Sequence, residues 1–213
     1  MRKTGVLIVI EGIDGAGKST QARGLVRRLR ARGFDAIVFR EPTGGRWGKE
    51  IRRRAKTAGS LTPEQELDLF LKDRKDNVER HLAPSLAEGR IVVLDRYYFS
   101  SIAYQGAKGL DPARIRRLNE RFAIRPDLVF ILDLGPGLGL ARIGSRKTRD
   151  ALFEREGYLR KVRRIFRSFR GRLFVPVDAR QDRLAIAKVI LDRTLKVIAR
   201  KRALAKAKHP SHS

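Results

Sequence analysis

The sequence contains no cysteine, only three histidines and a single tryptophan. The lack of cysteine excludes disulfides and cysteine-ligated metals, and it is typical of a reducing compartment. Two of the three histidines lie in the last five residues, so we expect no structural zinc centre. No apolar run approaches the roughly 20 residues that a membrane-spanning helix needs, and no apolar signal segment follows the basic N-terminus. We therefore expect a soluble, cytoplasmic protein without a membrane partner.

Acidic residues are also scarce, because 23 Asp and Glu stand against 49 Lys and Arg, which gives a net charge of +26. Such a charge attracts polyanions, including nucleotides, polyphosphate and nucleic acid. The basic residues are spread over several segments, however, and no nucleic-acid-binding module is recognisable. A solvated basic surface is the favoured interpretation, and we expect nucleic acid to bind only through non-specific electrostatic attraction.

The chain has neither a long linker rich in proline, glycine and serine nor an internal repeat. With 213 residues, of which 42% are hydrophobic, it can bury one sizeable core. We expect a single domain over residues 1–198, followed by a basic and frayed tail over residues 199–213.

A phosphate-binding loop is spelled out near the N-terminus. The apolar run 6–10 suits a buried strand, and the sequence then reads G-x-x-x-x-G-K-S before a segment with helical apolar spacing. An ordinary glycine-rich turn would not need these flanks. In this motif backbone N–H groups face phosphate oxygens at a helix N-terminus, the lysine reaches the terminal phosphates and the serine hydroxyl holds Mg²⁺. We expect ATP to contact the whole loop, which comprises Gly12, Ile13, Asp14, Gly15, Ala16, Gly17, Lys18, Ser19 and Thr20.

Further apolar runs alternate with helix signals along the rest of the chain. The runs cover residues 36–39, 91–94, 128–134 and 173–177. Thr62 and Asp111, each followed by proline, predict helix N-termini, and Pro84 is expected to kink or end the helix that starts near Pro63. This alternation predicts an α/β fold with a five-stranded parallel sheet and helices on both faces. In such a fold, ligands bind at the carboxyl ends of the strands.

Charged residues stand at two of these predicted strand ends. Asp95 and Arg96 follow the third strand, where the carboxylate can hold Mg²⁺ and the guanidinium can clamp a phosphate. Arg40 and Pro42 flank a glutamate at the end of the second strand and form a comparable site. The alternatives are a surface ion pair for the first and an ordinary exit from a strand for the second.

Glycines and arginines lie together after the fourth strand. A Gly-Pro-Gly sequence leads to Arg142, Arg146 and Arg149, which predicts a lid over residues 136–155. Phosphoryl transfer needs positive charge on the γ-phosphoryl group in a closed site from which water is excluded. The alternative is the basic face of a surface helix.

Together these motifs resemble the thymidylate kinase family, within the nucleoside monophosphate kinases, over almost the whole chain. The resemblance implies a P-loop kinase fold with a short lid, a homodimer, and transfer of the γ-phosphoryl group of MgATP to dTMP, giving dTDP and ADP. It implies that the lid arginines supply catalytic charge, because Gly15 and Ala16 provide none in the phosphate loop. The distinctive markers are residues 11–21, 40–42, 95–97, Phe70 with Arg74, and Tyr104 with Gln105.

Carried over by position, the family pattern also implies an acceptor pocket. Phe70 stacks on thymine, Arg74 hydrogen-bonds a base carbonyl, and Tyr104 packs where a ribose 2′-hydroxyl would clash. Asp14 meets the 3′-hydroxyl side of the sugar. The remaining implied contacts are Arg40 and Arg96 at the acceptor phosphate, Pro42 in the acceptor site, Ser101 and Gln105 near the base, and Ala179 and Arg180 near the adenine of ATP.

Other interpretations stay open at this point. By spacing alone, Phe70 and Tyr104 are more typical of core residues than of ligand contacts. A kinase that acts on another nucleoside monophosphate or on a deoxynucleoside, or a nucleotide-dependent nucleic-acid-binding protein, would also account for parts of the sequence.

Overall fold

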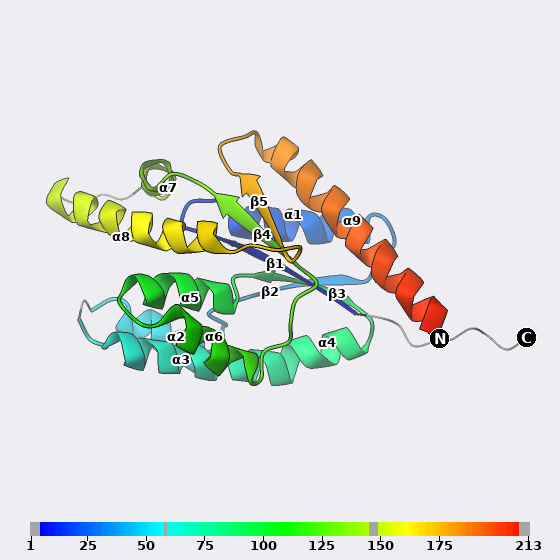
Figure 1. Ribbon diagram of the computed structural model, residues 1–213, viewed down its shortest axis with the longest axis horizontal. Helices are drawn as coiled ribbons and strands as arrows, with labels where there is room; N and C mark the ends of the chain where they lie inside the picture. The colour runs from blue at the N-terminus through cyan, green and yellow to red at the C-terminus, as the bar shows by residue number, and fades with distance from the viewer. Residues whose placement is uncertain (1–4, 58, 145–148, 209–213) are drawn as a thin grey trace, which may run out of the picture.

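A computed structural model describes residues 5–57, 59–144 and 149–208, and its centre is a parallel sheet (Figure 1). The strand order in the described residues is β2-β3-β1-β4-β5, which confirms the predicted five-stranded parallel sheet. Each strand coincides with a predicted apolar run, and no strand end differs from the prediction by more than two residues. The bounds are β1 Val6–Gly12, β2 Ala36–Arg40, β3 Ile91–Asp95, β4 Leu128–Asp133 and β5 Phe174–Asp178.

The central strand β1 is buried along its full length, as an apolar run covered on both faces requires. It pairs with β3 on one side, where Ile10 faces Asp95, and with β4 on the other, where Gly12 faces Leu132. The phosphate loop therefore leaves the sheet between the carboxyl ends of β3 and β4, where ligands bind in open parallel sheets.

Helices cover both faces of the sheet, as predicted (Figure 1). The helices α1 (Lys18–Arg30) and α9 (Arg183–Lys208) pack on one face. On the other face lie α4 (Ala83–Ala87), α5 (Tyr98–Ala107) and α8 (Arg149–Ser168). An outer layer is formed by α2 (Arg46–Arg54), α3 (Pro63–Asn77) and α6 (Pro112–Glu120), and α7 (Pro136–Arg142) lies at the carboxyl end of the sheet.

The predicted helix signals are present as structural caps. Thr62 and Gln65 form a reciprocal capping box at α3, and the Asp111 carboxylate accepts hydrogen bonds from two N–H groups at the start of α6. Pro84 interrupts the α3 path as expected, through a widened π-helical turn η1 (Val78–Leu82) that precedes α4. Proline lacks the N–H group that an α-helical turn would use, which accounts for the break at this point.

The expected frayed tail from residue 199 is wrong as far as Lys208, because α9 continues to that residue. Its last part consists of alanine, leucine, lysine and arginine, which are strong helix formers. Lys201 Nζ also pairs with Asp127 Oδ2 at 2.7 Å, and the Arg202 guanidinium lies 5.0 Å from the Phe34 ring centroid. Residues 209–213 lie outside the described part. No helix in the described ranges combines the length and apolar character that crossing a membrane would need.

Candidate active site

The phosphate loop has the backbone geometry that its motif predicts. Gly15 and Gly17 adopt φ values of 80° and 91°, in the left-handed region that glycine tolerates. Gly17 is the N-cap of α1, and no side chain caps this helix, so its first N–H groups are available to phosphate oxygens. The buried Lys18 ammonium donates a hydrogen bond to the Ile13 carbonyl across the loop, at 2.7 Å. Its burial, and the nearby Arg96, lower the pKa of Lys18 to about 7.

Ser19 and Asp95 meet beside this loop, as predicted for a metal site. The Ser19 hydroxyl donates a hydrogen bond to Asp95 Oδ2, and the Arg40 Nε lies 3.7 Å from the same oxygen. The other oxygen, Asp95 Oδ1, is buried without a hydrogen-bond partner in the described structure. These hard oxygen donors fit Mg²⁺. Three acidic or histidine side chains do not cluster anywhere in the described ranges, so phosphate and water oxygens would have to complete the coordination.

Arg96 and Asp14 form an ion pair in front of the loop. Arg96 has a left-handed backbone with φ 71°, and its N–H donates to the Ile10 carbonyl at 3.1 Å. Its guanidinium carbon lies 5.3 Å from the Tyr104 ring centroid. Burial would raise the pKa of Asp14, but the charges of Arg96 and Lys18 outweigh it and hold that pKa below its usual value. The predicted catalytic residues Lys18, Asp14 and Arg96 are therefore close together.

Glu11 is a site residue that sequence analysis did not assign. This fully buried carboxylate caps α5 from a different element, because it accepts hydrogen bonds from the N–H groups of Tyr97 (2.8 Å) and Ser100 (3.1 Å) and from the Ser100 hydroxyl (2.6 Å). Ser100 in turn accepts a hydrogen bond from Arg96 Nη1 at 3.3 Å. Burial raises the pKa of Glu11 to about 7. The available signal was a glutamate that follows five apolar residues inside a buried strand.

Arg74 and Phe70 lie one helical turn apart on α3 but differ in environment. Phe70 is half-buried and outside the hydrophobic core, which contradicts the core interpretation for this aromatic residue. The Arg74 side chain is 1% exposed. Its guanidinium donates to Glu41 (2.8 Å), Asn119 (2.6 Å) and Ser101 (3.2 Å). The structure thus joins the predicted contacts Arg74 and Ser101 through a buried network.

Other predicted acceptor contacts also sit in this half of the molecule. Tyr104 is partly buried and packs against the core, so the core interpretation holds in part for it. Gln105 Nε2 donates to Glu66 Oε2 at 3.0 Å, while Gln105 Oε1 is buried without a described partner.

The turn that carries Pro42 is held by two residues that sequence analysis missed. The buried Asp73 carboxylate accepts hydrogen bonds from the Thr43 N–H (2.8 Å) and hydroxyl (2.6 Å). Arg52 donates to the Pro42 carbonyl at 3.1 Å and to the Thr43 carbonyl at 2.6 Å. The backbone of α2 is also close, because a Cβ on Gly48 would lie 2.0 Å from the Thr43 carbonyl oxygen. Thirty residues separate Thr43 from Asp73, so no local pattern could have paired them.

On the donor side, α7 packs directly against the phosphate loop. A Cβ on Gly15 would lie 2.2 Å from the Gly139 carbonyl oxygen, and a Cβ on Gly139 would lie 2.6 Å from the Asp14 carbonyl oxygen. The backbones approach closely only because both residues are glycine. This contact gives a steric reason why the loop carries no basic side chain at residue 15.

The predicted lid segment is mostly helical where the structure describes it. Residues 136–142 form α7, Ile143 and Gly144 form a turn, and residues 149–155 belong to the 20-residue helix α8. Arg142 Nη1 donates to the carbonyl of the buried Ala179 at 3.2 Å, and Arg180 pairs with Asp178 at 2.8 Å. Arg142 is thus placed with the two predicted adenine contacts. Arg146 and the side chain of Arg149 lie outside the described residues.

Comparisons with known proteins identify the family of this chain. A family model described as "Thymidylate kinase" matches residues 10–190. A thymidylate kinase of Akkermansia muciniphila is 48% identical over 177 residues, which cover 83% of this chain and 85% of that protein. A thymidylate kinase of Xanthomonas campestris is 49% identical over 76% of this chain and 70% of its own length. A probable thymidylate kinase of Archaeoglobus fulgidus is 44% identical over 82% of this chain and 87% of its own length.

Proposed function

This chain belongs to the thymidylate kinase family, and we propose that it uses the residues gathered at the carboxyl end of its sheet to make dTDP and ADP from dTMP and MgATP. It is a phosphotransferase that acts as a dTMP kinase. The observation that carries the residue assignment is the convergence of Lys18, Ser19, Asp95 and the Asp14–Arg96 ion pair at one point.

The proposed chemistry is an in-line displacement that needs no protein nucleophile. An oxygen of the acceptor phosphate attacks the γ-phosphorus of ATP, a new P–O bond forms, and the bond to the β-phosphate oxygen breaks to release ADP. Catalysis of this kind is mostly positioning and electrostatic stabilisation. Lys18 leaves the Ile13 carbonyl to follow the β- and γ-phosphates, and the free N–H groups at the start of α1 bind the adjacent oxygens.

Ser19 and Asp95 are the residues that would hold Mg²⁺. When bound, the ion would neutralise charge on the phosphates of ATP. The unpartnered Asp95 Oδ1 supports this assignment, since a buried carboxylate oxygen without a hydrogen-bond partner is costly unless a ligand binds it.

Arg40 and Arg96 are proposed to hold the acceptor phosphate. Arg96 already faces the phosphate loop and is oriented by Asp14, Ser100 and the Tyr104 ring, so little conformational freedom remains to be lost on binding. The half-buried position of Phe70 outside the core supports its role as a stacking surface for thymine. Arg74 reaches the base edge only through the guanidinium protons that its three observed partners leave unused.

A coupled assay of ADP release across nucleoside monophosphates and deoxynucleosides tests the acceptor. We expect dTMP to be the best substrate and dUMP to follow it, because the thymine methyl group contributes only about 1–3 kcal/mol to discrimination. If CMP, GMP or a deoxynucleoside were phosphorylated faster than dTMP, the assignment of dTMP as the acceptor would be wrong, and the assignment of the protein as a kinase would remain.

Three parts of the proposal need their own measurements. Arg146→Ala should lower kcat more than it raises the KM for ATP if the lid arginines act on the transition state.

A homodimer should appear in light scattering at twice the mass of the 24.2 kDa chain. Cytoplasmic location stays a prediction that cell fractionation can test.

A further inference from the structure

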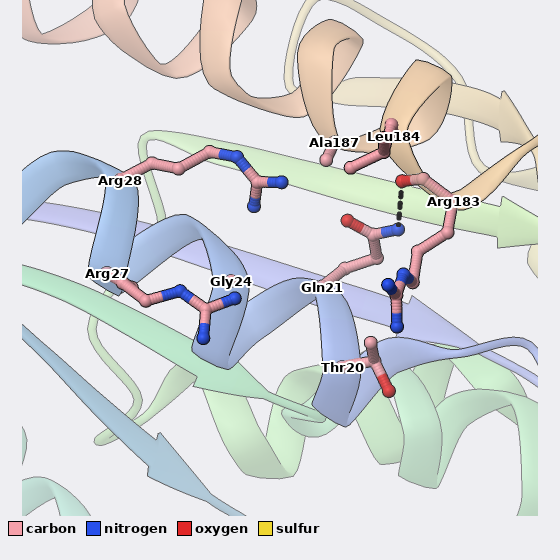
Figure 2. Close-up of a pocket in the computed structure, with 8 residues that line it drawn as sticks. All are labelled: Thr20, Gln21, Gly24, Arg27, Arg28, Arg183, Leu184 and Ala187. Atoms are coloured by element: carbon pink, nitrogen blue, oxygen red, sulfur yellow. Dashed lines mark hydrogen bonds between the residues drawn. The ribbon is translucent and has the colours of Figure 1, made fainter.

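A small pocket lies between α1 and α9, outside the residues assigned to ATP and dTMP except for Thr20 (Figure 2). Its volume is about 120 Å³. This is several times the space that one water needs, so the pocket can admit one tetrahedral phosphate group.

Three arginines surround this pocket, and acidic side chains are missing from its lining. Arg27 and Arg28 extend from α1, and Arg183 extends from the first turn of α9 towards Thr20 (Figure 2). Among the ion pairs of the described residues, none involves these three guanidinium groups, although 18 ion pairs occur elsewhere. Arg28 is partly buried, whereas Arg27 and Arg183 are exposed, so solvent weakens the repulsion between the three guanidinium groups. An anion between them would replace the remaining repulsion with attraction.

Two further contacts shape the pocket. Gln21 is buried and donates from Nε2 to the Arg183 carbonyl at 3.0 Å, which joins the start of α9 to α1 (Figure 2). Gly24 leaves the space that the Arg28 side chain occupies, because a Cβ at this position would lie 2.8 Å from Arg28 Nη1. A glycine in the interior of a helix costs roughly 0.5–1 kcal/mol relative to alanine.

We propose that this pocket binds a phosphate group as a second anion site beside the donor site. Arg28 and Arg183 hold the anion from two helices, and Arg27 and the Thr20 hydroxyl complete the site. The group could be inorganic phosphate, one end of pyrophosphate, or a phosphate of a second nucleotide. Because Thr20 also belongs to the phosphate loop, anion binding here is coupled to the donor site. The proposal concerns binding and does not depend on which acceptor the enzyme phosphorylates.

Isothermal titration calorimetry tests the site when the other phosphate sites are filled. The protein is saturated with Mg²⁺, the non-hydrolysable ATP analogue AMP-PNP and dTMP, and is then titrated with phosphate or pyrophosphate at ionic strength kept constant with chloride. We expect one additional binding event. A heat of phosphate binding identifies a free anion, as does a heat of pyrophosphate binding that remains after the same titration into Mg²⁺ without protein is subtracted. Two equivalents of AMP-PNP per chain identify a nucleotide phosphate. If dTMP gives no heat while the anion still binds, the acceptor assignment fails and the anion site stands.

Variants then separate this pocket from the general positive charge. Arg28→Gln with Arg183→Gln should weaken the additional event about tenfold or more, on the scale of losing two charged hydrogen-bond donors. The matched control, Arg193→Gln with Arg200→Gln, removes the same charge from exposed positions of α9 and should leave the affinity within about twofold. Gly24→Ala removes no charge but displaces the Arg28 guanidinium, and it should also weaken binding.

Two results would overturn the proposal. One is the absence of any heat of anion binding in a protein that also binds only one equivalent of AMP-PNP per chain. The other is an equal loss of affinity in the pocket variant and the surface control. Circular dichroism verifies that each variant is folded, and the two arginine pairs decide the question even if Gly24→Ala does not fold.

Discussion

Buried side-chain hydrogen bonds and an ion pair hold the acceptor half of the site together, whereas on the donor side the phosphate loop meets α7 through close backbone contacts between glycines. Around the acceptor, the Arg74–Glu41 ion pair and the Asp73–Thr43 hydrogen bonds are buried and join α3 to the turn after β2. Around the donor, the phosphate loop rests on α7 through Gly15 and Gly139. We therefore expect substitutions of the buried acceptor-side network to reduce folding stability as well as activity. Truncation of the phosphate-loop lysine on the donor side should reduce activity and leave stability nearly unchanged.

The largest expected effect is on the donor side, for Lys18→Ala. Losing the lysine of the phosphate loop, which can reach the terminal phosphates, should lower kcat by roughly 10³-fold, a scale typical of charged groups that stabilise the transferring phosphoryl group. Steady-state kinetics at saturating ATP measures the loss, and thermal unfolding should show little change in Tm. A folded variant with near-normal kcat would contradict the phosphate-loop assignment. Lys49→Ala, at an exposed position of α2, is the matched control.

Arg74→Met on the acceptor side should lower the free energy of unfolding. It leaves the Glu41 carboxylate buried without its charge partner, which costs about 3–5 kcal/mol of the free energy of unfolding. Burial already raises the pKa of Glu41, and Arg74 opposes this effect, so the variant should take up a proton at Glu41. Urea unfolding measures the change. The double variant Glu41→Gln with Arg74→Met should recover part of the lost stability. If Arg74→Met alone were as stable as the unmodified protein, the buried network around Arg74 would not stabilise the fold.

Gly139→Ala tests the backbone contact on the donor side. The added methyl group would lie 2.6 Å from the Asp14 carbonyl oxygen, so α7 must move away from the phosphate loop. Overpacking of this kind costs about 1–3 kcal/mol, and we expect the KM for ATP to rise about tenfold while the KM for dTMP stays within twofold. Gly137→Ala, in the same helix, meets no atom within 4 Å and should behave normally. Equal behaviour of the two variants would exclude a specific contact.

The smallest effect concerns pH. The Lys18 pKa of about 7 in the free enzyme means that its ammonium loses a proton as pH rises above 7, and only the charged form attracts phosphate. We expect kcat/KM for ATP to fall roughly fivefold between pH 7 and 8, while kcat stays flat because bound phosphates raise the lysine pKa. Lys18→Arg should abolish this decrease of kcat/KM above pH 7, even if the variant has a low kcat. A flat kcat/KM profile in the unmodified enzyme would contradict the lowered pKa.

Several acceptor-side features could not have been predicted from sequence because their partners are distant in the chain. Arg74 meets Glu41, Asn119 and Ser101, which come from three other segments. Asp73 and Arg52 hold a turn that neither of them adjoins in sequence. Sequence spacing along α3 correctly placed Phe70 and Arg74 one turn apart, but it could not indicate that one would be half-buried and the other enclosed.

By itself, the sequence determined the strands, the phosphate loop, the caps of α3 and α6 and the family, because each depends on residues adjacent in the chain and on backbone geometry. Only the tertiary structure decided how α7 meets Gly15, how Glu11 caps α5, and that α9 continues to Lys208. It also decided that Arg28 and Arg183 lie around one pocket. The physical reason is that burial and charge pairing depend on which helices the parallel sheet brings together, and local residue preferences carry no information about that pairing.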